Sequence, residues 1–198
     1  MTKELDLTGI KIGFAITGSH CMLAEVMKVM LDLRRRGGDL TVIISGSVRD
    51  SDTKFGHAAN WRLQAEEISG KALIDCIVDA EPIGPEAIFD LLVIAPCSGN
   101  TIAKLANGIT DSAVLMAAKA HLRNQRPVLV AISSNDALGM NLRNIGSLLN
   151  SKNIYFVPFG QDNYKQKANS LVADMSKIGD AALLAMAGRQ MQPLLLRD

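Results

Sequence analysis

Small polar side chains follow four of the five segments that we expect to be strands. They read TGS at 17–19, SGS at 45–47, PCSGNT at 96–101 and SSND at 133–136. Hydroxyl groups and free N–H groups at the start of a helix can bind a phosphate without a lysine. Taken singly, each sequence is more typical of a helix N-cap than of a ligand site. Four of them at one end of a sheet predict a ligand site.

The same segments exclude two common nucleotide sites. A dinucleotide-binding domain needs G-x-G-x-x-G after its first strand and an acidic residue at the end of its second. Here the first turn reads GFAITGS and the second strand ends in SGS, and no phosphate-binding G-x-x-x-x-G-K-[ST] is present. FMN, which has one phosphate and a polar ribityl chain, fits several neutral hydroxyl loops better.

The elements that position these residues alternate between strands and helices. Strands are expected at 10–16, 40–44, 91–95, 128–132 and 154–157. Helices are expected at 21–36, 58–68, 102–106, 112–123, 138–149 and 171–186, while 72–78 fits either state. Strands that are apolar on both faces and alternate with helices indicate a parallel sheet covered on both sides. We therefore predict a single three-layer α/β/α, Rossmann-like or flavodoxin-like domain over 1–198, with its core at about 10–159 and a C-terminal helix and tail at 170–198.

The composition of the chain limits the kinds of partner that we expect it to bind. The chain has 198 residues, 48% hydrophobic and 4% aromatic, and 21 basic against 20 acidic residues give a net charge of +1. This balance predicts no nucleic-acid partner, and the apolar runs are too short for a membrane span. Its three cysteines have neither disulfide nor zinc spacing, so we expect a cytoplasmic protein without a metal site.

Three motifs carry a resemblance to a known family. TGSHCMLAEV, PCSGNTIAKLANGITD and LRNIGSLL resemble the flavoprotein family of FMN-binding cysteine decarboxylases and flavin prenyltransferases over about 10–159. The resemblance implies bound FMN, with the segments 17–19 and 98–101 near its phosphate or ribityl chain and Ser45 and Ser47 on its other side. The cofactor-binding residues expected in this way are Thr17, Gly18, Ser19, Ser45, Ser47, Pro96, Cys97, Ser98, Asn100, Thr101 and Ser133.

Two departures from that family concern the substrate. By alignment, Ser133 stands where flavin prenyltransferases carry an arginine, and ISSN at 132–135 replaces the P-x-M-N signature of the cysteine decarboxylases. Loss of both signatures is what a family member with a different substrate would show.

The resemblance also implies an activity and a partner. It points to one component of a sporulation oxidoreductase that converts a dihydropyridine dicarboxylate, or its hydroxy-tetrahydro precursor, to the aromatic pyridine in the mother cell. A partner A subunit would carry its own dinucleotide-binding domain with NADP, and this chain would form a homo-oligomer. Alternatives are a stand-alone flavin-dependent decarboxylase or prenyltransferase, and a non-catalytic scaffold for the A subunit.

The sequence offers fewer candidates for catalytic residues than for cofactor-binding residues. His57 is a candidate acid or base because imidazole titrates near neutral pH, and Cys97 is the thiol placed best near a flavin; a surface histidine and a buried turn cysteine are the alternatives. His20 could face a cofactor from the first turn, and His121 is expected to be structural. Candidates for binding substrate carboxylates are Arg49, Lys54, Arg62 and Arg143.

Overall fold

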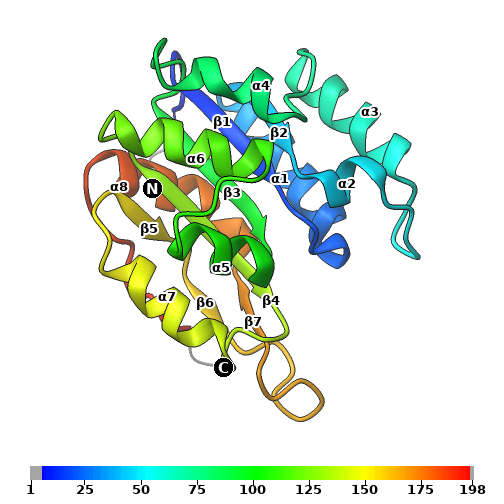
Figure 1. Ribbon diagram of the computed structural model, residues 1–198, viewed down its shortest axis with the longest axis vertical. Helices are drawn as coiled ribbons and strands as arrows, with labels where there is room; N and C mark the ends of the chain where they lie inside the picture. Colours follow the sequence, from blue (N-terminus) through cyan, green and yellow to red (C-terminus); the bar gives the residue numbers. More distant parts are fainter. Residues whose placement is uncertain (1–5, 197–198) are drawn as a thin grey trace.

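A seven-stranded sheet forms the centre of the molecule (Figure 1). The computed structural model describes residues 6–196. The sheet has the order β2-β1-β3-β4-β7-β6, and β5 also pairs with β4. Its strands are β1 (Lys11–Ile16), β2 (Asp39–Ile44), β3 (Leu91–Cys97), β4 (Val128–Ser134), β5 (Ile154–Phe156), β6 (Phe159–Gly160) and β7 (Leu171–Ala173).

The first five strands are parallel and place the ligand site. β1 pairs with β2 on one side and with β3 on the other, and β4 lies between β3 and β5. The chain therefore reverses its direction of travel across the sheet at β1. In open α/β sheets, the crevice beyond the carboxyl ends of the strands at such a switch point is where ligands bind. Here that crevice lies between the ends of β1 and β3.

Helices cover both faces of the sheet, which confirms the expected flavodoxin-like α/β class. α1 and α8 pack together on one face, and α4, α5, α6 and α7 lie on the other (Figure 1). The helices are α1 (Leu23–Arg35), α2 (Gly46–Asp50), α3 (Ala58–Ser69), α4 (Ile77–Ala80), α5 (Gly99–Ala106), α6 (Ala113–Arg123), α7 (Asn141–Leu149) and α8 (Ile178–Met186). Short 3-10 turns span His20–Met22, Glu81–Ile83 and Met175–Lys177. Within residues 6–196, no helix is both long and apolar enough to cross a membrane.

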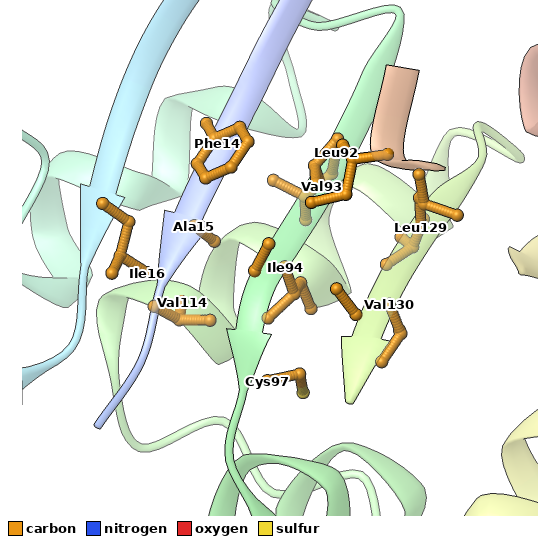
Figure 2. Close-up of a cluster of buried hydrophobic side chains, with 14 of the residues drawn as sticks. Phe14, Ala15, Ile16, Leu92, Val93, Ile94, Cys97, Val114, Leu129 and Val130 are labelled. Atoms are coloured by element: carbon orange, nitrogen blue, oxygen red, sulfur yellow. The ribbon is translucent and has the colours of Figure 1, made fainter. Parts of the chain in front are cut away.

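The core explains why these segments form strands. Every residue of β3 is buried, as are five of the six residues of β1. Figure 2 shows side chains of β1, β3 and β4, among them Phe14, Val93 and Val130, packed against one another. A strand buried on both faces needs a continuous apolar run, and the sequence provides one.

The structure corrects the expectation of one helix over 171–186. Leu171–Ala173 instead forms β7, which runs antiparallel to β4 and β6, so the sheet is mixed. Asp174 then starts a 3-10 turn because its side chain accepts a hydrogen bond from the Ser176 N–H, and α8 begins only at Ile178. The ambiguous segment 72–78 is divided, since Ile74 bridges to Ile43 of β2 and α4 starts at Ile77.

His121 is a buried structural residue, as expected, and it makes the stability of the folded state depend on pH. It is 1% exposed, and its Nε2 lies 3.0 Å from the carbonyl oxygen of Pro127. Burial lowers the pKa of His121 from 6.5 to about 4. Because the unfolded chain then binds a proton that the folded chain does not, the folded state loses stability as pH falls from 6.5 to about 4.

We predict that this loss disappears in His121→Gln. Between pH 7.5 and 4.5 the natural chain should lose roughly 2–3 kcal/mol more unfolding free energy than the variant, the value of about two pKa units. Urea unfolding of both proteins at each pH measures this difference. Parallel pH dependences for the two proteins would contradict the prediction.

Candidate functional site

The hydroxyl of Thr17 joins the ends of β1 and β3. Thr17 Oγ1 donates to the carbonyl oxygen of Pro96 at 2.6 Å and accepts from the Ser98 N–H at 2.9 Å. Thr17 is 1% exposed, and its bond to Pro96 is shielded from water. This side chain therefore fixes where the 98–101 segment begins relative to the first turn.

The first turn is also tied to β4 and to the end of β2. Ser19 Oγ donates to the carbonyl oxygen of Ser133 at 2.6 Å. A Cβ on Gly18 would lie 2.8 Å from Ser47 Oγ, closer than such contacts normally are, so a residue without a side chain lets the two loops approach. The four polar segments that the sequence placed at strand ends are thus brought together.

A cavity of about 390 Å³, called here the strand-end pocket, opens between these segments. Hydroxyl and amide side chains make up most of its polar lining. It is lined by Gly18, Ser45, Gly46, Ser47, Ser98, Asn100, Thr101, Lys104, Asp111, Ser112 and Leu115. Six of the eleven expected cofactor-binding residues are in this set.

The start of α5 forms one wall of the strand-end pocket. Ser98 caps the helix by accepting from the Thr101 N–H at 3.4 Å, and its hydroxyl lies 3.1 Å from that of Thr101. Helix capping therefore explains part of the PCSGNT motif at 96–101. The remaining N–H groups and the positive end of the helix dipole still favour an anion here.

Ser45 shows that capping does not account for the whole site. It occupies the N-cap position of α2, yet its side chain makes no capping bond. Its hydroxyl oxygen is buried and has no hydrogen-bond partner among the described residues. A buried hydroxyl without a partner is costly. A ligand rich in phosphate and hydroxyl oxygens would satisfy it, so the strand-end pocket fits FMN chemically.

Sequence reasoning missed the charged pair in this pocket. Lys104 Nζ lies 2.6 Å from Asp111 Oδ2, and both residues line the cavity. Both residues belong to the AKLANGITD motif, which contributed to the family resemblance. No separate role was assigned to either side chain from the sequence. The pair closes the loop between α5 and α6.

A second cavity of about 570 Å³, the loop pocket, adjoins the first and shares Gly18 and Ser98 with it. Loops far apart in the sequence form its walls. It is lined by Gly18, Ser19, His20, Cys21, Thr53, Lys54, Phe55, Ser98, Gly99, Ser133, Ser134, Asn135, Asp162, Lys167, Ser170 and Val172. Ser19 and Ser133, both expected at the cofactor, lie here.

His20 lies where the two pockets meet. It lines the loop pocket, and its Nε2 is 3.1 Å from the hydroxyl of Ser47, which lines the other cavity. Its Nδ1 is buried and has no partner among residues 6–196. Burial lowers the pKa of His20, so the imidazole is neutral at pH 7. It is the histidine placed best for proton transfer.

Three expected cofactor-binding residues lie behind the site. Thr17, Pro96 and Cys97 line neither pocket. Cys97 is 0% exposed and packs near Ile94 and Val130 in the core (Figure 2), and burial raises the pKa of its thiol. A thiol without access to a cavity and with a raised pKa does not suit nucleophilic chemistry, so we propose no catalytic role for Cys97.

The structure does not bring His57 to either pocket. Its side chain is 73% exposed, and its Nδ1 lies 3.0 Å from Asp52 Oδ2. The other oxygen of Asp52 accepts from the Ala58 N–H at 2.8 Å, at the start of α3. This arrangement is that of a surface histidine beside a helix cap.

Of the four candidate carboxylate-binding residues, only Lys54 lines either pocket, and it lies in the loop pocket. Arg49 is instead bound to Asp50, with 2.8 Å between Nε and Oδ1, and to the Asp75 carbonyl oxygen. Arg62 and Arg143 line neither cavity.

Comparisons with known proteins found matches over most of this chain. The family model described as Flavoprotein matches residues 1–181. The B subunit of dipicolinate synthase from Bacillus subtilis is 45% identical over 193 residues, which cover 98% of this chain and 96% of that protein.

Two solved structures are similar. A crystal structure of the same dipicolinate synthase component from Bacillus halodurans has a TM-score of 0.90 and 46% identity, covering 98% of this chain and 99% of the other. The FMN-dependent cysteine decarboxylase SpaF has a TM-score of 0.66 at 21% identity, covering 90% of this chain and 98% of the other, and thus shares the fold.

We predict that Thr17→Val lowers the unfolding free energy by about 1–3 kcal/mol, because it leaves the buried Pro96 carbonyl group and the Ser98 N–H without their partner. Thr17→Ser keeps the hydroxyl and should cost less. Urea unfolding of the three proteins tests this, and a valine variant as stable as the natural chain would rule out the bridging role.

Proposed function

Because the chain belongs to the Flavoprotein family, we propose that it is the FMN-binding B subunit of a dipicolinate synthase. In this proposal it acts with an A subunit to oxidise dihydrodipicolinate, or its hydroxy-tetrahydro precursor, to pyridine-2,6-dicarboxylate during sporulation. The similarity to the Bacillus subtilis protein over 98% of the chain supports the assignment.

The observation that carries the cofactor part is the unpartnered Ser45 hydroxyl in a cavity of neutral donors. We infer that Ser45, Ser47, Ser98, Asn100 and Thr101 hold the phosphate and ribityl groups. Gly18 and Ser19 would lie beside the cofactor at the first turn. Pro96 and Cys97 would support that wall from behind, as Thr17 does.

Aromatisation of dihydrodipicolinate requires removal of a hydride and a proton, and the hydroxy-tetrahydro precursor must also lose a molecule of water. Bound FMN would supply a two-electron acceptor, and NADP on the A subunit is the other candidate for that role. Within this chain, His20 is the group that can take the proton, since it is neutral and lines the loop pocket. The contact between its Nε2 and Ser47 would hold the ring in place.

The assembly is part of the same proposal. The A subunit would bring the dinucleotide-binding domain that this sequence lacks. We also infer that the chain forms a homo-oligomer in the cytoplasm of the mother cell. Leu195 forms a β-bridge with Phe159, yet its residue is 65% exposed, so it is one apolar side chain that such an interface would cover.

Ser133 argues against a stand-alone prenyltransferase, and the ISSN segment at 132–135 argues against a decarboxylase. Ser133 is 5% exposed, it pairs with Val172 of β7, and its carbonyl oxygen accepts from Ser19. No guanidinium therefore stands at this position to bind an isoprenyl phosphate. Incubation with a prenyl phosphate or an acyl-cysteine substrate should give no product.

The first test is the visible spectrum of the purified protein with added FMN. Uptake of the cofactor, followed by oxidation that depends on the A subunit, would support the proposal. A protein that takes up no FMN would overturn the cofactor assignment. A protein that takes up FMN and only stabilises the A subunit, without changing its rate of oxidation, would instead act as a scaffold.

We predict that Ser45→Ala weakens FMN binding roughly tenfold, the value of one hydrogen bond to a charged group. Because the hydroxyl has no protein partner, the unfolding free energy of the free chain should stay within about 0.5 kcal/mol of its original value or rise. Fluorescence titration with FMN and urea unfolding measure the two quantities.

Ser147→Ala is the matched control, because Ser147 lies on α7 and lines neither pocket. It should leave FMN affinity unchanged. If Ser45→Ala also binds FMN as tightly as the natural chain, the hydroxyl does not contact the cofactor.

A further inference from the structure

Two lysines reach the loop pocket from different parts of the chain. Lys54 lies in the segment between α2 and α3, and Lys167 lies in the loop between β6 and β7. In Figure 1 the first segment (cyan) lies at the right edge of the molecule, and the second (orange) forms the loop at its lower end. Residues of both segments line the same cavity.

The ammonium group of Lys54 is available for an anion. It has no carboxylate within 4.0 Å in the part of the chain that the structure describes. Its Nζ lies 5.2 Å from the centre of the Phe55 ring, which lines the same cavity. This contact orients the cation without neutralising it.

Lys167 has one carboxylate beside it. Its Nζ lies 3.1 Å from Asp162 Oδ2, and its side chain is 54% exposed. Asp162 is the single acidic residue in the lining of the loop pocket, against two lysines and a neutral His20. The formal charge of the lining is thus +1, which favours an anion over a cation or a neutral ring.

The rest of the lining suits a small polar ring. Ser133, Ser134 and Asn135 at the end of β4 provide neutral hydrogen-bonding groups. Because the loop pocket shares Gly18 and Ser98 with the strand-end pocket, a ring bound here would lie next to a ligand bound there. The volume of about 570 Å³ accommodates a pyridine with two substituents.

We propose that the loop pocket is the substrate site and binds a small ring that carries two carboxylates, with Lys54 binding one carboxylate and Lys167 the other. The inference rests on the proposed function for the identity of the ring, and it adds the residues that recognise it. Asp162 holds Lys167 in position and weakens its attraction for the anion.

Calorimetric titration with pyridine-2,6-dicarboxylate tests the proposal, on the full chain with and without FMN. Lys54→Ala and Lys167→Ala should each weaken binding roughly tenfold, the value of one charge-assisted hydrogen bond. Asp162→Asn should strengthen it, because a competing negative charge is removed. Lys165→Ala is the control, since Lys165 lies in the same loop as Lys167 and does not line the pocket.

Titration with pyridine-2-carboxylate, which has a single carboxylate, tests whether both carboxylates are recognised. The natural chain should prefer the dicarboxylate, and each lysine variant should lose most of that preference while its affinity for FMN stays unchanged. Equal binding of the dicarboxylate by the natural chain and both lysine variants would overturn the proposal, as would a loss caused equally by Lys165→Ala.

The experiments can refute the cofactor assignment and the substrate-site proposal separately. If the chain takes up FMN but binds no dicarboxylate, the substrate site is wrong and the cofactor assignment remains. If the chain ignores FMN but its binding of the dicarboxylate depends on both lysines, the cofactor assignment is wrong and the anion site is supported.

Discussion

The hydrogen bonds of the Thr17 hydroxyl are the constraint on which the site depends. The paired residues of β1 and β3 end at Ala15 and Ile94, and the register of β3 against β4 shifts before Cys97. Pro96 has no N–H to donate, and it lies where the ladder is interrupted before β3 pairs with β4 again at Cys97. The side chain of Thr17 takes over, bonding the Pro96 carbonyl and the Ser98 N–H. A side chain thereby sets the position from which α5 starts, at the one point of the sheet where the topology leaves a crevice.

That constraint divides the small polar residues into two groups. Thr17, Ser98 and Ser19 are engaged with the protein itself, through the strand ends, the α5 cap and the Ser133 carbonyl. The Ser45 hydroxyl has no partner among residues 6–196, and Asn100 is exposed to the strand-end pocket. A sequence cannot separate these groups, because a capping serine and a ligand-binding serine have the same side chain and both follow a strand. The location of the site could therefore be predicted from the motifs, whereas the role of each hydroxyl needed the structure.

The same reasoning explains which elements were predictable. Runs such as 91–95 and 128–132 are short, apolar throughout and rich in branched side chains, as expected of strands buried on both faces. Leu171–Ala173 is equally apolar but only three residues long and lies next to a true helix, so the two patterns merged into one expected helix. Lys54 was a candidate for carboxylate binding, whereas Lys167 and its place in the same cavity were missed for another reason. Lys54 and Lys167 are 113 positions apart in the sequence, and no spacing rule connects two loops that meet only through the tertiary fold.

The two adjoining cavities differ in how they can recognise an anion. In the strand-end pocket, short hydroxyl and amide side chains make up most of the polar lining, and the one lysine in that lining, Lys104, is paired with Asp111. Fixed neutral donors lose little entropy when a ligand binds and suit a cofactor that stays in place. In the loop pocket, the positive charge lies on long side chains from loop segments, and Lys54 is unpaired within the described residues. Such groups attract an anion over a distance and release it readily, which suits a ligand that must enter and leave at every turnover. Because the whole chain carries a net charge of only +1, this attraction has to come from the local placement of the two lysines.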